Sequence, residues 1–360
     1  MQAKRYLLSA GGTGGHIFPA LAIADALKAD NPDNEILFVG ALGRMEMEKV
    51  PAQGYRIIGL EIAGLQRKIS FQNLLLPQKI WRSITNAKKI IRSFEPHCVI
   101  GFGGYASAPV LFAAQKLNYP TIIQEQNSYA GLTNKILAKK AKAICVAYPE
   151  METYFNPKKI RLTGNPLRPN ILESTSKSQG LQHFSFTGSK PVMLVLGGSL
   201  GARSINSWLS QNCDLLQKTF DIIWQCGSYY FDYYKHLIQN SIQILPFIGE
   251  MNLAYAAADI IVSRSGASSI SELCAVAKPV VFVPSPNVAA DHQTKNAKAL
   301  VNKNAALIIK DAEMFEKLTD LLLALNHDFE KRNMLSANIK TLAILDAPSR
   351  ILNEIKKYEK

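Results

Sequence analysis

The sequence is poor in cysteine and lacks any long uncharged apolar run. It has five cysteines in 360 residues, none in Cys-x-x-Cys spacing. This argues against a disulfide scaffold or a structural zinc site and favours a reducing cytosol. No apolar run approaches the ~18–20 residues that a membrane-spanning helix needs. The apolar stretch near the start is too short for a signal peptide.

Acidic residues are also scarce relative to basic ones. Lys and Arg number 41 against 28 Asp and Glu, a net charge of +13. The excess is concentrated in 1–165, with 21 basic and 11 acidic residues, whereas 166–360 holds 20 and 17. Such a basic half indicates an anionic partner, namely nucleic acid, a membrane surface or a phosphorylated substrate. The chain carries no recognisable nucleic-acid-reading module, so nucleic acid is not an expected partner.

The sequence does contain short apolar runs that alternate with helical patterns. The runs lie at 6–8, 35–39, 97–102, 120–124, 143–147, 160–163, 192–196, 220–225, 242–247, 259–263, 280–284 and 306–309. Continuous apolar strands are typical of a parallel sheet covered on both faces, and their alternation with helices favours βαβ units. We therefore expect an α/β protein with two doubly wound, Rossmann-like domains facing a cleft.

Two prolines and a glycine at 164–169 predict the domain boundary. We expect an N-terminal domain over 1–165 and a C-terminal domain over 166–340. The tail at about 341–360 is helical in pattern. The sequence leaves open which domain it packs on, and the first domain is one candidate. The stretch 174–190 is rich in Ser, Gln and Gly and is expected to be a loop.

Three glycine-rich turns, at 9–16, 101–107 and 196–203, each follow a predicted strand. Glycine lets the backbone approach a ligand closely, and a helix start offers N–H groups and a partial positive charge to phosphate. Glycines that only make tight turns are the alternative. Three such turns in one chain favour contacts with a diphosphate or a sugar.

The same turns do not fit the common nucleotide-cofactor motifs. A Gly-x-Gly-x-x-Gly dinucleotide motif that begins at Gly12 needs a glycine at position 17, which is Ile17. The acidic residue that binds the ribose in such sites is also missing from the end of the second predicted strand of each half. No Gly-Lys-Ser/Thr follows the glycines, so NAD(P) and ATP are excluded. An Asp-x-Asp metal motif is also absent. No cofactor and no protein-bound metal are therefore expected.

Seven sequence blocks together resemble the MurG family of bacterial glycosyltransferases, which make lipid II. The blocks lie at 11–16, 101–107, 125–127, 163–168, 197–202, 263–267 and 291–297. The resemblance spans about 5–310 and implies the two-domain glycosyltransferase fold called GT-B. It implies transfer of N-acetylglucosamine from UDP-N-acetylglucosamine to lipid I, an undecaprenyl-diphosphate glycopeptide, with inversion and without an essential metal. It also implies a peripheral location on the cytoplasmic face of the membrane.

Two residues are candidates for the catalytic base that takes the acceptor proton. His16 closes the first glycine loop at a helix start, where the positive end of the helix disfavours the imidazolium form. Glu125 ends a predicted strand and is a rival or a helper, although a structural role is common at such a place. The resemblance implies that Thr13, Gly14, Gly15 and Asn127 contact the donor sugar. For Asn127 a turn-capping role is the alternative.

The resemblance places the other substrate contacts in several blocks. For UDP-N-acetylglucosamine these are Arg168, Ser199, Ile248, Ala267, Ser268, Ser269, Ile270, Ser271, Glu272 and Gln293, and for the acceptor diphosphate they are Gly103, Gly104 and Tyr105. Two of these predicted contacts have a structural alternative. Ser199 fits a helix N-cap, and the segment 269–272 fits a capping box, with Glu272 three residues after Ser269.

The segment 65–92 is the candidate membrane-binding region. It holds seven cations among apolar residues, and no acid lies between Glu61 and Glu95. Cations near anionic lipid each contribute about 1 kcal/mol, and apolar side chains add insertion. The alternative is an amphipathic helix packed on the core with a solvated basic face. Four lysines extend the predicted patch: Lys135, Lys139, Lys140 and Lys142.

Two other functions fit some of these features. Another GT-B enzyme, such as a glycolipid glycosyltransferase or a UDP-N-acetylglucosamine 2-epimerase, has the same fold and a nucleotide-sugar donor. A nucleic-acid-binding protein is suggested by net charge alone.

Overall fold

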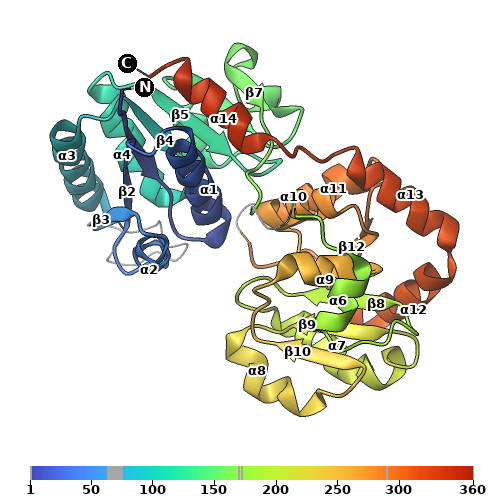
Figure 1. Ribbon diagram of the computed structural model, residues 1–360. Helices are drawn as coiled ribbons and strands as arrows, with labels where there is room; N and C mark the ends of the chain where they lie inside the picture. Colours follow the sequence, from blue (N-terminus) through green and yellow to red (C-terminus); the bar gives the residue numbers. More distant parts are fainter. Residues whose placement is uncertain (1, 63–75, 169–170, 172, 289–290, 360) are drawn as a thin grey trace. The chain divides into compact units, whose positions relative to one another are not determined.

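The computed structural model describes residues 2–62, 76–168, 171, 173–288 and 291–359. The chain divides into two compact units (Figure 1). One contains Met1–Leu167 and Asp346–Lys360, and the other contains Arg168–Leu345. The chain therefore passes from one unit to the other inside the Pro- and Gly-containing segment 164–169.

The N-terminal unit contains a seven-stranded parallel sheet in the order β3-β2-β1-β4-β5-β6-β7. Its strands are β1 (Arg5–Ser9), β2 (Glu35–Ala41), β3 (Arg56–Leu60), β4 (Cys98–Gly101), β5 (Thr121–Glu125), β6 (Ala143–Val146) and β7 (Ile160–Leu162). The strand order reverses between β1 and β4, where Ser9 pairs with Gly101. Two glycine-rich turns follow these neighbouring strands. They therefore share the switch point at which open α/β sheets bind ligands.

Helices cover both faces of this sheet. They are α1 (Gly14–Asp30), α2 (Glu46–Lys49), α3 (Leu76–Phe94), α4 (Gly104–Lys116), α5 (Leu132–Leu137) and α14 (Ala347–Lys356). Leu8 lies in a core cluster with residues of α1 and α14, whereas Leu7 lies in another with residues of α3 and α4. Successive strand residues thus face opposite helical layers, as expected of a sheet buried on both sides. The helix α14, drawn in red, completes the N-terminal unit (Figure 1).

The C-terminal unit repeats this plan with six parallel strands in the order β10-β9-β8-β11-β12-β13. The strands are β8 (Val192–Leu196), β9 (Asp221–Gln225), β10 (Ile242–Leu245), β11 (Ile260–Ser263), β12 (Val280–Phe282) and β13 (Leu307–Ile308). The helices are α6 (Lys177–His183), α7 (Arg203–Leu216), α8 (Ser228–Tyr234), α9 (Met251–Ala257), α10 (Ala267–Val276), α11 (His292–Val301), α12 (Met314–His327) and α13 (Phe329–Lys340). Leu196 pairs with Ser263 across the switch point between β8 and β11. The third glycine-rich turn and the start of α10 follow these two strands.

The predicted fold class of two doubly wound parallel α/β domains is confirmed. The strand β3 was not predicted. It lies at the edge of the sheet, and Gly59, a residue type depleted in strands, interrupts its apolar residues Ile57, Ile58 and Leu60. The expectation of a loop over 174–190 is wrong, since α6 lies within it. Ser176 and Gln179 form a capping box at the start of α6 and supply the local signal for a helix.

Candidate active site

The first glycine loop orients the ring of His16. His16 is the third residue of α1, and its Nδ1 lies 3.2 Å from the carbonyl oxygen of Gly11 and 3.1 Å from Oγ1 of Thr13. A carbonyl oxygen can only accept, so Nδ1 donates in the contact with Gly11. In a neutral ring Nε2 is then the nitrogen that takes up a proton, as a general base must.

The second glycine loop lies against the first. Gly103 and Gly104 have φ of +90° and +76°, in the left-handed region that favours glycine. A Cβ on Gly103 would lie 3.2 Å from Nε2 of His16, and one on Gly104 would overlap the Gly11 carbonyl oxygen. The structure thus brings together two predicted groups, the candidate base and the loop expected to hold the acceptor diphosphate. The ring of Tyr105, from the second loop, lies against Gly12 of the first loop, because a Cβ on Gly12 would lie 3.1 Å from that ring.

Glu125 is surrounded by hydrogen-bond donors. It is 2% exposed, and its Oε2 accepts from the Asn134 side-chain amide at 2.8 Å and from the Gly131 N–H at 3.0 Å. Its Oε1 accepts from the N–H and the side-chain amide of Asn127 at 3.1 and 3.3 Å. The Glu125 carboxylate therefore accepts four hydrogen bonds from the loop that follows β5 and from the start of α5, and it fixes their conformation. This geometry favours a positioning role for Glu125 over that of the base.

The C-terminal unit contains a cavity of about 710 Å³ at the carboxyl ends of its strands. The third glycine loop lines it through Gly197, Gly198 and Gly201. The first turns of three helices also line it: Ala202 and Arg203 at α7, Gly266 and Ser269 at α10, and Gln293 at α11. Its volume is in the range of small-molecule sites, and three helix N-termini provide partial positive charge. The cavity therefore suits an anionic ligand such as a nucleoside diphosphate.

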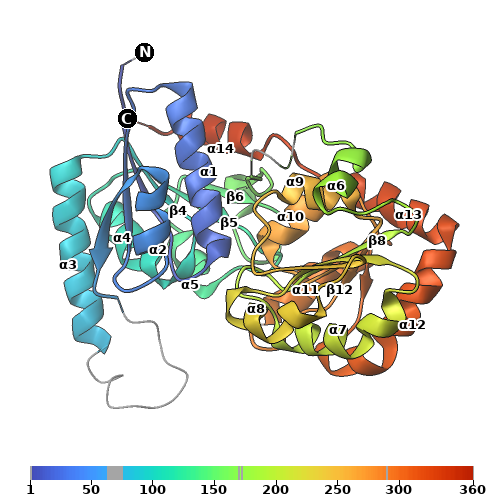
Figure 2. The same cartoon turned by 60° about the horizontal axis from the view of Figure 1, so that its bottom comes forward.

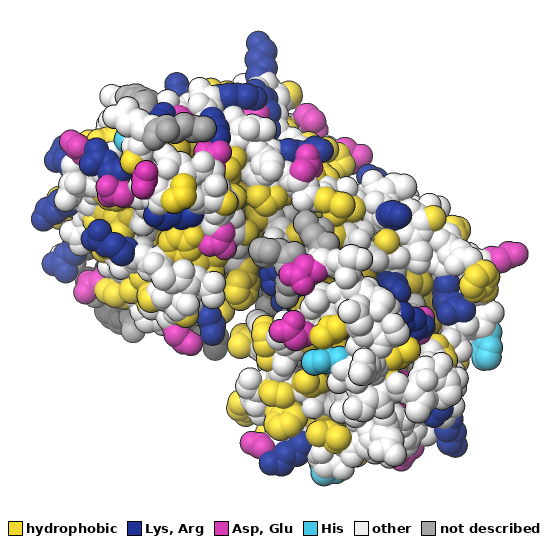
Figure 3. Space-filling model, viewed as in Figure 1, with side chains coloured by type: hydrophobic (Ala, Val, Ile, Leu, Met, Phe, Trp, Pro, Cys, Tyr) yellow, Lys and Arg dark blue, Asp and Glu magenta, His cyan; other side chains and the backbone are white. Residues whose placement is uncertain are grey.

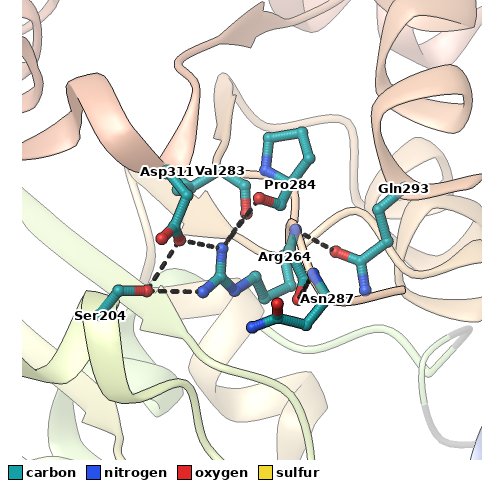
Figure 4. Close-up of polar contacts among 8 residues, drawn as sticks. Ser204, Arg264, Val283, Pro284, Asn287, Gln293 and Asp311 are labelled. Carbon is teal, nitrogen blue, oxygen red and sulfur yellow. Dashed lines mark hydrogen bonds and ion pairs between the residues drawn. The ribbon is translucent and has the colours of Figure 1, made fainter. Parts of the chain in front are cut away.

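Arg264 connects the segments around this cavity (Figure 4). Its side chain is 11% exposed, and its Nη1 lies 2.6 Å from Oδ1 of Asp311. Nη1 also donates to the carbonyls of Val283 and Pro284, and Nη2 donates to the Ser204 hydroxyl at 2.7 Å. One guanidinium thus fixes the start of α7, the loop after β12 and the segment carrying Asp311.

None of the residues in this cluster was predicted from the sequence to have a role. Arg264 stands inside the block at 263–267, which was a usable signal. Asp311 lies 47 positions away, without any local motif.

Arg168 and Glu272 bind each other. The guanidinium Nε and Nη2 of Arg168 donate to the two carboxylate oxygens of Glu272 at 2.7 and 2.6 Å, and the Tyr255 hydroxyl donates to Oε2 at 3.3 Å. Burial disfavours the charged form of Arg168, but the hydrogen bonds and charge of Glu272 outweigh it and raise the pKa of the guanidinium. Burial, followed by the charge of Glu272, raises the pKa of Tyr255 well above its usual value.

Two predicted caps are wrong. The helix α10 begins at Ala267 with Gly266 as its N-cap, so Ser269 lies inside the first turn and forms no capping box with Glu272. Ser199 is an exposed turn residue, and the N-cap of α7 is Ala202. Ser199 instead lines a smaller cavity of about 310 Å³. The helix α7 thus begins after the predicted cap Ser199, whereas α10 begins before the predicted cap Ser269.

The remaining predicted donor contacts have local partners. The side chain of Ile248 is buried, and its N–H donates to Oε1 of Gln225 at 3.0 Å. Oε1 of Gln293 accepts from the N–H of Ser285 at 2.8 Å, which ties the start of α11 to the cavity wall (Figure 4). Ser268, Ile270 and Ser271 lie in the first half of α10, where Ile270 packs into the core.

The predicted membrane-binding region is described only in part, because 63–75 lie outside the described residues. The helix α3 runs along one side of the N-terminal unit (Figure 2), and Lys79, Arg82, Lys89 and Arg92 are exposed on it. Dark blue Lys and Arg side chains lie over this helix in Figure 3. Exposed apolar side chains accompany them: Ile80 and Trp81 on α3, Phe112 on the neighbouring α4, and Leu132 and Ile136 on α5.

Two kinds of feature are absent from the described residues. No helix there is long and apolar enough to span a bilayer. No group of three or more His, Cys, Asp or Glu side chains in the same part of the chain is arranged to hold a metal ion.

Comparison with protein families identifies the class. The glycosyltransferase family 28 N-terminal domain matches residues 6–146, and the family 28 C-terminal domain matches residues 192–351. A crystal structure of the calicheamicin glycosyltransferase CalG4 has the same fold, with a TM-score of 0.74 at 14% identity over 99% of this chain and 98% of that chain. The fold and the nucleotide-sized cavity therefore define a two-domain glycosyltransferase of the GT-B type.

Relatives of higher sequence identity show to which family of glycosyltransferases the chain belongs. A Flavobacterium psychrophilum protein named UDP-N-acetylglucosamine–N-acetylmuramyl-(pentapeptide) pyrophosphoryl-undecaprenol N-acetylglucosamine transferase is 50% identical, over 99% of this chain and 98% of its own. A Cytophaga hutchinsonii protein of that name is 52% identical over 98% and 96%. The crystal structure of Acinetobacter baumannii MurG has a TM-score of 0.80 at 29% identity, over 99% of this chain and all of that chain. The chain belongs to this family of N-acetylglucosamine transferases, the MurG family.

Proposed function

We propose that this protein transfers N-acetylglucosamine from UDP-N-acetylglucosamine to the 4-hydroxyl of the muramyl sugar of lipid I, giving lipid II for peptidoglycan synthesis. The observation that carries the proposal is the identity of about 50%, over nearly the whole chain, to curated proteins named for this activity. The glycine-lined site within each unit agrees with it.

The N-terminal unit supplies the candidate base. Nε2 of His16 accepts the proton of the acceptor hydroxyl as its oxygen attacks the anomeric carbon and the bond to UDP breaks. This single displacement inverts the anomeric configuration and needs no protein nucleophile. Gly103 and Gly104 lie beside His16, and the Tyr105 ring lies beside Gly12. These three residues are the proposed contacts of the acceptor diphosphate. Thr13, Gly14, Gly15 and Asn127 remain predicted donor-sugar contacts.

The C-terminal unit holds the donor nucleotide. The starts of α7, α10 and α11 line its cavity, so their dipoles and first-turn N–H groups are placed to stabilise the negative charge of departing UDP. The charge of Arg264 is balanced by Asp311, so we assign Arg264 to holding the cavity wall. Arg168 and Ser199 are proposed contacts of the donor diphosphate and uridine, Glu272 is a proposed ribose contact, and Gln293 is a proposed sugar contact.

Transfer of labelled N-acetylglucosamine from its UDP derivative to a short-chain lipid I analogue, with and without EDTA, tests this function. We expect labelled lipid II in both conditions. Conversion of the donor to its 2-epimer without acceptor would instead indicate an epimerase.

In the same assay His16→Ala should lower kcat by about 10²–10⁴-fold and leave the KM for donor within about twofold. His327→Ala, at an exposed histidine, is the matched control. Wild-type turnover of His16→Ala would remove this residue from the mechanism.

We further propose that 65–92 and α5 bind the anionic cytoplasmic face of the membrane, where a lipid-linked acceptor would be found. The support is the mixture of exposed cations with Trp81, which is 67% exposed, and Leu132. Sedimentation with vesicles containing anionic lipid should fall several-fold for Trp81→Ser with Leu132→Ser. Phe329→Ser, at an equally exposed aromatic in the C-terminal unit, should sediment as wild type. Unchanged sedimentation of the double variant would contradict this assignment. No binding to DNA is expected.

A further inference from the structure

Glu46 is a buried carboxylate that the mechanism above does not use. It is the first residue of α2 and is 1% exposed. Its Oε1 accepts from the N–H of Ala41 at 3.0 Å, and its Oε2 accepts from the N–H of Gly12 at 3.2 Å. Both hydrogen bonds come from backbone N–H groups. Burying a carboxylate in this way costs free energy, which suggests a role beyond packing.

The N–H of Gly12 and the carbonyl of Gly11 belong to one peptide unit. The carbonyl oxygen of Gly11 accepts from Nδ1 of His16 at 3.2 Å. Glu46 and His16 therefore contact opposite ends of the same planar peptide group, one as acceptor from its N–H and the other as donor to its oxygen.

We propose that Glu46 is a positioning residue for His16 and acts through the Gly11–Gly12 peptide. This inference rests on the proposed role of His16 as the base. A hydrogen bond to the carboxylate polarises the peptide and strengthens its oxygen as an acceptor. That keeps the proton on Nδ1 and leaves Nε2 to receive a proton from the acceptor hydroxyl. The negative charge also favours the imidazolium that forms, a task that the aspartate of a Ser-His-Asp triad performs by direct contact.

The surrounding glycines leave room for this arrangement. A Cβ on Gly11 would lie 2.6 Å from Oε1 of Glu46, and one on Gly40 would lie 2.6 Å from its Cγ. Side chains at either position would therefore push the carboxylate away from the loop. The carboxylate reaches the peptide because both neighbouring positions lack a Cβ.

A purely structural role for Glu46 makes different predictions. A loop anchor would stabilise the glycine loop without changing which nitrogen of His16 carries the proton. The Thr13 hydroxyl, 3.1 Å from Nδ1, also offers a competing arrangement in which Nδ1 accepts. The tautomer of His16 in the full-length wild-type protein separates these possibilities.

The first measurement is ¹⁵N NMR of the histidine rings in the full chain, with the His16 signals assigned by their loss in His16→Gln. We expect the Nδ1–H tautomer in the wild type. In Glu46→Gln we expect a mixture of tautomers, a kcat about 10–100-fold lower, and an unchanged KM for UDP-N-acetylglucosamine. The acidic limb of the kcat–pH profile should move to lower pH by ~0.5–1 unit, since a nearby negative charge no longer favours the protonated ring.

Glu354→Gln is the matched control, because Glu354 is also a buried glutamate of the N-terminal unit and pairs with Arg161 and Lys357. It should leave the His16 tautomer and the pH profile as in the wild type. Glu46→Asp keeps the charge and should retain the wild-type tautomer with a smaller loss of kcat. Thermal melting and UDP binding show whether Glu46→Gln folds. If it does not fold, Glu46→Asp is measured in its place.

The outcomes separate this inference from the proposed function. An Nε2–H tautomer in the wild type overturns the inference without any variant. If Glu46→Gln keeps the wild-type tautomer and pH profile, the inference about Glu46 is overturned. The base assignment still stands in that case, provided that His16→Gln is inactive. An active His16→Gln removes the base itself, whatever Glu46 does.

Discussion

Arg168 and Glu272 form a bidentate ion pair although they are 104 positions apart in the sequence. Both carboxylate oxygens accept from the guanidinium, and Oε2 also accepts from Tyr255. Each residue was predicted to contact the nucleotide. On the proposed ribose contact, the hydroxyls would bind the remaining lone pairs of a carboxylate that the protein already orients. Such preorganisation lowers the cost of ordering the site when the nucleotide binds.

Glu272→Gln should weaken UDP binding by about tenfold or more and lower the free energy of unfolding by about 1–3 kcal/mol. The reason is that it removes the buried carboxylate of the pair and leaves Arg168, whose side chain is 36% exposed, without its counter-charge. Titration calorimetry with UDP and thermal unfolding measure the two effects. Glu313→Gln, which removes the ion pairs of Glu313 with the exposed Lys310 and Lys317, should leave the UDP affinity unchanged. A wild-type Kd for UDP in Glu272→Gln would restrict this residue to a structural role.

Asp311→Asn should lower the free energy of unfolding by about 3 kcal/mol and raise the Kd for UDP, because it leaves the guanidinium of Arg264 buried without its counter-charge. Arg264→Lys should also bind UDP more weakly, since an ammonium has three donors for the four groups that Arg264 contacts. Asp259→Asn is the control, because the Asp259 side chain is also 20% exposed and paired but does not line the cavity. If Asp311→Asn and Asp259→Asn affected UDP binding equally, the Arg264 cluster would have no special role there.

Gly104→Ala should abolish most activity and destabilise the N-terminal unit. Its φ of +76° disfavours any side chain, and a Cβ would overlap the Gly11 carbonyl oxygen that orients His16. Gly54→Ala separates the two causes: Gly54 has φ of +80°, but a Cβ added there would have no atom within 4 Å. It should cost only the backbone strain of about 1 kcal/mol and leave kcat unchanged. Equal effects of the two variants on kcat would argue against the contact between the loops.

The five cysteines should not react with Ellman's reagent in the native protein at pH 8. All five are buried, and burial raises the pKa of Cys226 to about 11 and that of Cys145 and Cys274 to about 12. A thiol of pKa 11 is only about 0.1% thiolate at pH 8, and the thiolate is the reacting form. Five thiols should react after unfolding in guanidinium. Rapid reaction of one native thiol would show that its site opens.

The same shifts predict how stability depends on alkaline pH. The folded state favours the neutral thiols, so their contribution is complete below the pKa of an unfolded thiol, about 8.5. It is lost as the pH rises from there through the folded pKa, about 11 for Cys226 and about 12 for Cys145 and Cys274, because the unfolded chain then releases protons that the folded chain retains. The midpoint of urea unfolding should therefore fall over this range. A Cys226→Ala variant, compared with the wild type, should show a weaker fall.

Much of the fold could be predicted from the sequence because buried parallel strands are continuous apolar runs. The run at 192–196 coincides with β8, and the run at 35–39 lies inside β2. The edge strand β3 was not predicted, because Gly59 interrupts its short apolar sequence. The starts of α7 and α10 were placed wrongly because serine is a good N-cap only where the backbone enters the helix at that residue. The helix α7 begins after Ser199, at Arg203, and α10 begins before Ser269, at Ala267.

The sequence by itself determined the alternation of strands and helices, the glycine positions and the family, because these depend on residue type and local spacing. Only the tertiary structure decided which distant groups meet. It placed Asp311 against Arg264, and it joined Glu46 to His16 through the Gly11–Gly12 peptide. Strand order brings such residues to one sheet edge, and side-chain packing sets their distances, so neither can be read from the order of residues along the chain.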